Sequence, residues 1–289
     1  MQLGTGKRHL RGIDLAGKVR QGERMMLRKS RWRLAAFFWS VVGVCFGGPK
    51  VTVLAWHIHA GLGSGGVRGI ERSQAVLEAH PADVVLLFSA DKGTRRAKQV
   101  DQAGELGEAV GRESFFRESL PWEGGSYGDA ILYPAKHKMI KELLLPDVQE
   151  EEPRYLRDHL ITLPEWPGPL GIGMAHLSHA SQNRPGQANA VNAHYRELQG
   201  QPTVLAVNTY GKVGTPEHFN LSVAWEEVGD PEKQPKFPAK KPHTAYLHLF
   251  VRPFDAWQVI STKVLPNSDA SQSRPLLVEL EYLGSKADR

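Results

Sequence analysis

The residues of this 289-residue chain that could do chemistry stand where apolar runs end. In "ADVVLLFSADKGTRR", Ser89 closes an apolar run and the basic segment 92–98, which contains Arg95 and Arg96, follows it. A serine acts as a nucleophile when a sharp strand-to-helix turn presents it, yet neither Ser89 nor Ser273 lies in a nucleophile-elbow sequence. Serine-based catalysis is therefore not expected here.

The basic segment 92–98 allows two interpretations. Arg95 and Arg96 could hold a phosphate group, because guanidinium groups pair well with phosphate oxygens. A charged loop in contact with solvent is the other interpretation. Asp101 and Gln102, a few residues further on, are expected to cap the next helix.

The elements that must position these residues are buried strands with few helices between them. The sequence predicts strands at 50–58, 82–90, 127–133, 159–165, 170–177, 203–210, 245–251, 257–265 and 275–283, and helices at 69–80, 101–111 and 187–199. This order favours a layered sheet sandwich with outer helices over a regular βαβ fold. The glycine-rich loop 61–66 lacks the helix start and the acidic partner of a dinucleotide-binding fingerprint.

The first 49 residues form a basic tail with an apolar segment at about 34–48. The segment is too short to span a bilayer comfortably, and it suits an export signal or a short anchor. A buried helix, or an artefact of the choice of start site, is the alternative. We therefore expect an exported or membrane-associated protein, or a cytoplasmic one if the segment is not a signal.

Composition limits the remaining classes of function. With 41% hydrophobic residues, the region 50–285 can bury the core of one large domain. The formal net charge of +5 is too small to indicate nucleic-acid binding, since part of the excess lies in the tail. Cys45, the only cysteine, falls in the apolar segment, so the domain itself has no thiolate chemistry.

Six segments in order resemble the endonuclease/exonuclease/phosphatase superfamily: "LAWHIHAGLG", "ADVVLLFSADKGTRR", "YGDAIL", "AHLSH", "TVLAVNTY" and "SRPLLVELEY". The resemblance covers residues 50–283. It implies a four-layered α/β sandwich of two packed mixed sheets with outer helices. It also implies hydrolysis of phosphoesters with Mg²⁺ or Mn²⁺, held by carboxylate oxygens.

Most positions that the resemblance marks as catalytic or metal-binding carry other residues. Of the polar catalytic positions only His176 is retained, and Asp129 stands where the family has an asparagine. The substituted positions are His57, Ser89, Ser178, Asn208, Tyr210, Leu247, Gln272 and Ser273. A one-residue shift would place His248 instead of Leu247 at one of them.

The scaffold residues of the same motifs persist, among them Trp56, Asp91, Arg274 and Pro275. Selective loss of the chemical residues favours a catalytically degenerate protein without a cofactor, of natural or engineered origin. Such a protein could bind a phosphate-containing ligand or a protein partner in the former active-site cleft. The alternative is an active metal-dependent phosphodiesterase or phosphatase with an atypical site, in which His57, His176 and His248 bind Zn²⁺.

Overall fold

The computed structural model describes residues 47–148, 152–198, 200–266 and 269–284. The N-terminal tail up to residue 46, with most of the apolar segment 34–48, lies outside the described residues. Among the helices that are described, none combines the length and the apolar character needed to cross a membrane.

Twelve strands are described, and they form two six-stranded mixed sheets. In the first sheet the order is β11 (Trp257–Val264), β12 (Leu276–Tyr282), β1 (Lys50–His57), β2 (Val84–Lys92), β4 (Gly125–Tyr133) and β3 (Glu113–Trp122). In the second it is β5 (Lys136–Leu144), β6 (Tyr155–Thr162), β7 (Leu170–His176), β8 (Thr203–Asn208), β10 (Leu247–Arg252) and β9 (Glu226–Glu227).

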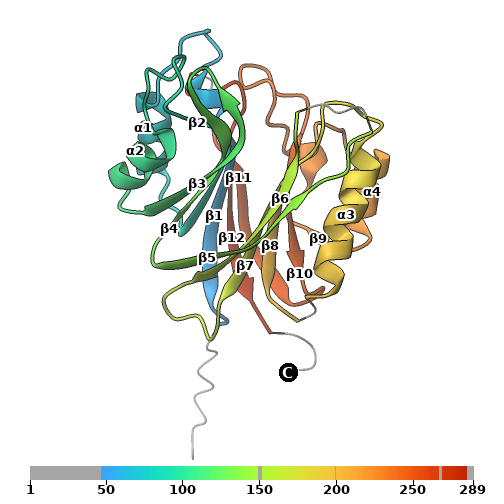
Figure 1. Cartoon of the computed structure of the whole chain (residues 1–289). Coiled ribbons are helices and arrows are strands. Elements are labelled where there is room, and N and C mark those ends of the chain that lie inside the picture. The colour runs from blue at the N-terminus through green and yellow to red at the C-terminus, as the bar shows by residue number, and fades with distance from the viewer. Residues whose placement is uncertain (1–46, 149–151, 199, 267–268, 285–289) are drawn as a thin grey trace, which may run out of the picture. The chain divides into compact units, whose positions relative to one another are not determined.

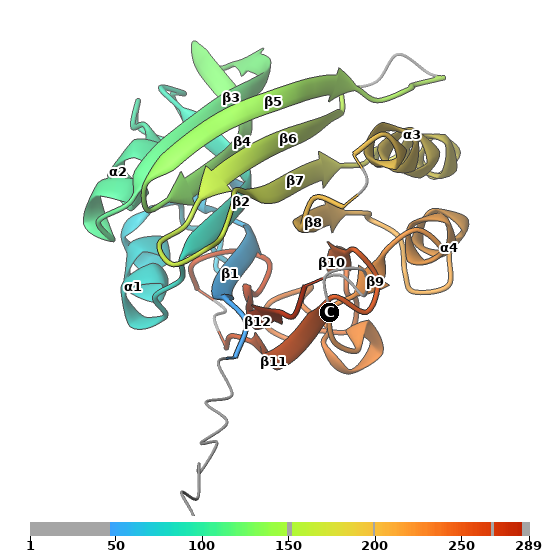
Figure 2. The same ribbon diagram turned by 90° about the horizontal axis from the view of Figure 1, so that it is seen from below.

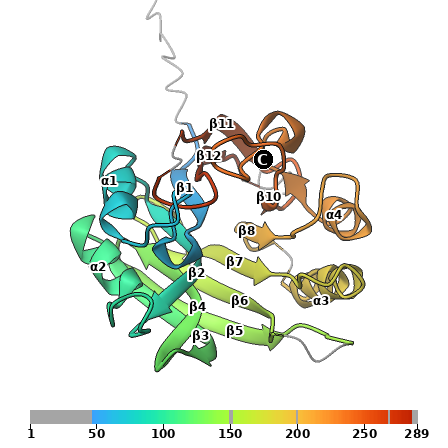
Figure 3. The same ribbon diagram turned by 90° about the horizontal axis from the view of Figure 1, so that it is seen from above.

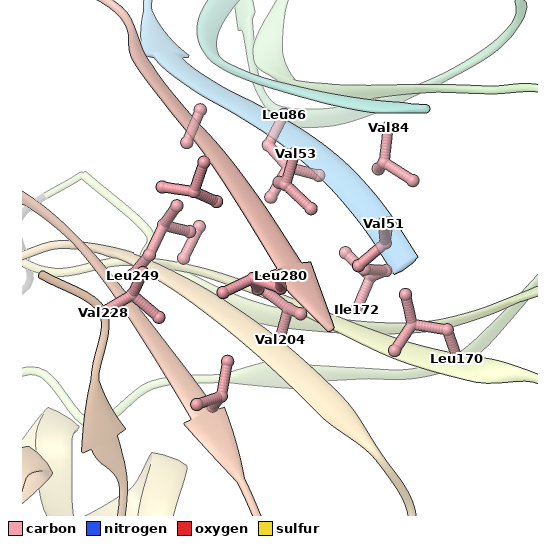
Figure 4. Packing of buried hydrophobic residues seen from close by; sticks show 14 of the residues in the cluster. Val51, Val53, Val84, Leu86, Leu170, Ile172, Val204, Val228, Leu249 and Leu280 are labelled. Carbon is pink, nitrogen blue, oxygen red and sulfur yellow. The ribbon is translucent and has the colours of Figure 1, made fainter. Parts of the chain in front are cut away.

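The two sheets pack face to face through alternating β-branched and leucine side chains. Strands β1 and β2 direct every second residue at β7, β8 and β10, as period-two alternation requires. Figure 4 shows this core between the sheets, with Val51, Val53, Val84 and Leu86 on one side and Leu170, Ile172, Val204 and Leu249 on the other. The inward faces of the two sheets therefore pack against each other along most of their length.

Helices cover the outer faces, as Figures 1 and 2 show. Helices α1 (Glu71–Ala79) and α2 (Gln102–Ala109) pack on the first sheet through Leu77 and Leu106. Helices α3 (Arg184–Arg196) and α4 (Pro216–Ser222) pack on the second through Val191 and Leu221. The expected four-layered α/β sandwich is confirmed.

Parallel pairing at the centre of each sheet brings polar residues to one end of the sandwich. Strands β1 and β2 run parallel in the first sheet, and β7 and β8 run parallel in the second. The carboxyl ends of these four strands carry His57, Ser89, His176 and Asn208. This end points up in Figure 1 and toward the viewer in Figure 3.

Four elements were not expected from the sequence. The edge strands β3 and β5 are largely exposed and rich in charged residues, which disfavours edge-to-edge association of sheets. The same charged residues interrupt the apolar pattern by which a strand is recognised in a sequence. Helix α4 and the two-residue strand β9 are short, and they lie in the segment between "TVLAVNTY" and "AYLHLFV".

Candidate functional site

A cleft of about 550 Å³ opens at the end of the sandwich where the central strands terminate. Its walls come from both sheets and from the loops that follow them. The lining residues are His57, His59, Leu62, Arg68, Ser89, Arg96, Tyr127, His179, Arg184, Tyr210, Phe237, Tyr246, Gln272 and Ser273. Three arginines and no Asp or Glu line it in the described part of the chain. Arg96 and Arg184 are paired with Asp91 and Glu217 behind the lining, so Arg68 contributes most of the uncompensated positive charge that an anion would meet.

Asn208 joins two buried histidines at the cleft floor. Its Nδ2 donates to His57 Nδ1 at 2.8 Å and lies 3.4 Å from His176 Nε2. The Tyr210 hydroxyl donates to the same His176 nitrogen at 2.7 Å. Since ring nitrogens that accept hydrogen bonds carry no proton, both imidazoles are held in fixed neutral tautomers.

Burial keeps these histidines uncharged. It lowers the pKa of His57 well below the ordinary value, with the neighbouring imidazoles adding to the effect. Burial likewise lowers the pKa of His59 and of His176 to about 4 each. The rings of His57 and His59 stack at 3.8 Å, an arrangement that two charged imidazoles would resist. The positive charge of the cleft therefore resides on its arginines.

Ser89 occupies a β-bulge at the rim of the first sheet. The register between β2 and β4 shifts between Leu87 and Ala90, and Ser89 has a φ of 60°. Its hydroxyl is 2.6 Å from the Tyr127 hydroxyl, and its amide donates to Asp129 Oδ1 at 3.1 Å. Burial raises the pKa of Tyr127 to about 12, so this pair stays neutral. Among the described residues, neither of the side chains bonded to Ser89 would take its proton as a general base does.

Asp129 is a carboxylate beside the cleft floor, and it is bound to an arginine. Its Oδ2 accepts from Arg157 Nη1 at 2.7 Å, and its Oδ1 lies 3.5 Å from His176 Nδ1. Burial by itself would raise the pKa of Asp129, but His176 and Arg157 lower it overall. Asp129 therefore links the two sheets as an ion-paired carboxylate and orients the His176 ring.

The basic segment 92–98 does not behave as a freely solvated loop. Asp91 is fully buried and accepts from Thr94 Oγ1 at 2.6 Å and from Arg96 Nε and Nη2 at 2.6 and 2.8 Å. Arg96 then lines the cleft, whereas Arg95 is exposed and lies outside its lining. Of the two arginines proposed to bind phosphate, only Arg96 is placed to do so.

Asp101 caps α2 as expected, since its side chain accepts from the Gly104 amide at 3.1 Å. Gln102 does not cap the helix. Its Oε1 accepts from the Asp91 amide at 2.8 Å, so this residue supports the loop that carries Arg96.

Two of the substituted positions, and His248 as the alternative to one of them, lie outside the cleft. Leu247 is buried in the core between the sheets, although its backbone pairs with Asn208. Ser178 is fully buried and accepts from the Ala180 amide at the start of the loop before α3. His248 follows Leu247 on β10 and so faces the opposite side of the sheet, where it contacts Glu227. The zinc set of His57, His176 and His248 is thus not brought together.

The residues present do not fit the divalent cation that the resemblance implies. A hard cation needs carboxylate oxygens with open lone pairs, and the positions that the resemblance expects to supply them hold Ser89, Asn208, Leu247 and Gln272. Asp91 and Asp129, two carboxylates near the cleft, accept from arginines instead. The donor set of the cleft floor is imidazole, amide and hydroxyl.

Several lining residues were not found from the sequence. Arg68 donates from Nη1 to the carbonyls of His59 and Ala60 at 3.1 and 3.2 Å. Arg184 begins α3 and lies 3.1 Å from Glu217. Phe237 and Tyr246, whose rings are 5.2 Å apart, come from the segment before β10. None of these residues stands in a motif, and only the folded chain gathers them.

The chain has the fold seen in solved structures of endonuclease/exonuclease/phosphatase proteins. One similar structure is an endonuclease/exonuclease/phosphatase from Beutenbergia cavernae, which is 20% identical with a TM-score of 0.60 over 81% of this chain and 72% of that one. No protein-family model matches the chain, and no curated protein does.

Two further structures have more specific names. A mannosyl-6-phosphatase from Bacteroides thetaiotaomicron is 16% identical, with a TM-score of 0.63 over 80% of this chain and 99% of that one. The human Nocturnin catalytic domain with bound sulfate is 15% identical, with a TM-score of 0.63 over 81% and 95%. The TM-scores establish a shared fold, and identities this low support a shared fold alone.

Proposed function

We propose that the cleft binds a phosphate-containing ligand and that the protein does not perform the metal-dependent hydrolysis of the superfamily. The observation that carries the proposal is the lining itself, in which Arg68, Arg96 and Arg184 occur without any Asp or Glu in the described residues. Guanidinium groups bind phosphate oxygens through charge-assisted hydrogen bonds. The sulfate in the Nocturnin domain is consistent with anion binding in this fold.

The aromatic rim extends the proposal to organic phosphates. Phe237, Tyr246 and Tyr210 form one wall of the cleft, with ring centroids 5.2 and 6.1 Å apart. An apolar group of a ligand would pack on these rings while its phosphate lies near the arginines. The proposal retains the expected export or membrane association through the segment 34–48, which lies outside the described residues, and it leaves a protein partner as a further occupant of the cleft.

Binding should depend on Arg68 and not on Arg95. We expect Arg68→Ala to weaken binding of phenylphosphonate, which cannot be hydrolysed, by roughly 10–100-fold, because a hydrogen bond to a charged group contributes about 1.5–3 kcal/mol. The measurement is isothermal titration calorimetry. Arg95→Ala is the matched control, since Arg95 is exposed outside the cleft, and it should leave the affinity unchanged. Equal losses in the two variants would refute a site at this cleft.

Hydrolysis should be absent. We expect no turnover of bis-p-nitrophenyl phosphate, plasmid DNA or p-nitrophenyl phosphate with Mg²⁺, Mn²⁺ or Zn²⁺, because the cleft floor supplies no free carboxylate to a cation. Turnover that requires a metal and disappears in His176→Ala would instead favour the alternative, an active phosphoesterase with an atypical site. Initial rates measured by p-nitrophenolate release and gel mobility distinguish these outcomes.

A further inference from the structure

A second cluster of chemically active side chains lies behind the cleft, on the outer face of the second sheet. His218 from α4, Glu227 from β9 and His248 from β10 meet there, and one ligand atom of each lies within 4.8 Å of the others. Glu227 Oε2 is 2.9 Å from His218 Nε2, and Glu227 Oε1 is 2.7 Å from His248 Nδ1. The cluster joins three elements that are otherwise separate in the sequence.

The protons of this cluster can be assigned from its hydrogen bonds. The Gly214 amide donates to His218 Nδ1 at 3.3 Å, so the hydrogen of this ring is on Nε2 and is donated to Glu227. His248 donates from Nδ1 to the other oxygen, and its Nε2 is buried without a partner in the described residues. Both imidazoles are then neutral and the carboxylate is ionised, which are the charge states that metal binding requires, with each ring hydrogen on the nitrogen that faces Glu227.

The donor set matches a transition metal rather than magnesium. Two imidazoles and one carboxylate form a known zinc-binding combination, with metal–ligand distances of about 2.0–2.2 Å. All three residues are at least partly shielded, with His248 only 1% exposed. To bind a metal through the nitrogens that face Glu227, each ring moves its hydrogen to its far nitrogen. His248 Nε2 can accept it directly, and His218 Nδ1 can accept it once the long Gly214 bond opens.

We propose that His218, Glu227 and His248 form a zinc site, distinct from the cleft, with water as the fourth ligand. The metal would tie α4 and β9 to β10, the strand that pairs with β8 and its cleft residue Asn208. Lys236, the buried amine in this region, donates to the Gln234 carbonyl at 2.8 Å, and its charge opposes a bound cation. The proposal does not depend on the function proposed for the cleft.

Equilibrium dialysis of the full chain against Zn²⁺ tests this site. We expect about one equivalent to bind to the unaltered protein and none to Glu227→Gln or His218→Gln, which keep the shape of each side chain close to the original. His57→Gln, in the cleft, and Cys45→Ser, outside the described residues, are the controls and should still bind one equivalent. A folded protein without bound zinc, or undiminished binding by Glu227→Gln, would overturn the proposal.

Thermal unfolding gives a second measurement that does not rely on the dialysis. Zinc at about 100 times its Kd should raise the Tm of the unaltered protein by roughly 5–10 °C. Glu227→Gln should show no rise, provided that its circular dichroism matches that of the unaltered protein. A rise that persists in Glu227→Gln would place the zinc elsewhere and contradict the assignment.

Discussion

Acidification is expected to lower the free energy of unfolding by about 4 kcal/mol per pH unit near pH 5. Burial lowers the pKa of His59 and His176 to about 4 and that of His159 to about 3, whereas unfolded histidine has a pKa near 6.5. Between these values the three histidines together bind about three more protons in the unfolded chain than in the folded one, and His57, whose pKa burial also lowers, adds to this difference. The stabilisation that comes from keeping these histidines neutral is therefore fully present above about pH 7, and it is lost as the pH falls toward 4.

His159 allows the contribution of one site to be isolated. Its Nδ1 is 2.8 Å from His137 Nε2, away from the cleft and beside Phe115. We expect His159→Phe to reduce the pH slope by about 1.4 kcal/mol per pH unit, the effect of one proton. Urea unfolding at half-unit steps from pH 7.5 to 4.5 measures it. His243→Gln, which removes an exposed imidazole, is the control, and equal slopes in both variants would show that burial is not the cause.

The sequence predicted the centre of the fold better than its edges. Strands such as β1, β2 and β8 are buried on both faces, so their apolar runs are unbroken and their ends are marked by polar residues. Strands β3 and β5 lie at sheet edges and mix charged, exposed residues with half-buried ones, a pattern that also fits loops. Burial on both faces is thus the physical feature that made strands recognisable.

The cleft was predictable where a strand end carries the residue and unpredictable where a loop does. His57, Ser89, His176 and Asn208 come together because parallel strands end at the same edge of each sheet. Arg68 and Arg184 reach the cleft from loops and a helix start whose course no local pattern fixes.

The prediction of site residues on β10 was wrong for a different reason, because it did not settle which face of the sheet each residue occupies. A period of two places Leu247 and His248 on opposite faces of the sheet. Only the observed register with β8 shows that Leu247 packs in the core and that His248 meets Glu227. The resemblance located the strand in the sequence, but it did not determine toward which face of the sheet each side chain points.

The ion pair beneath the cleft is expected to be the most important polar contact for stability. The Arg157 guanidinium is 2% exposed and donates to Asp129 at 2.7 Å, to Glu142 at 3.0 Å and to the Glu118 carbonyl at 2.9 Å. These partners come from β4, β5 and β3, so one side chain from β6 connects both sheets. We expect Arg157→Met to lower the free energy of unfolding by about 3–5 kcal/mol, because Asp129 would remain buried without a counter-ion.

Arg117 provides a matched control for this substitution, because it binds the same Glu142 through two hydrogen bonds of 2.7 and 2.8 Å from a position that is 47% exposed. Arg117→Met should cost no more than about 1 kcal/mol in urea unfolding, as exposed ion pairs do. Adding Asp129→Asn to Arg157→Met should recover part of the loss, since the uncompensated charge is then removed. Equal costs for the two arginines would contradict the view that Asp129 is held by Arg157 as a structural carboxylate, and Asp129 would again be a candidate ligand for a cation in the cleft.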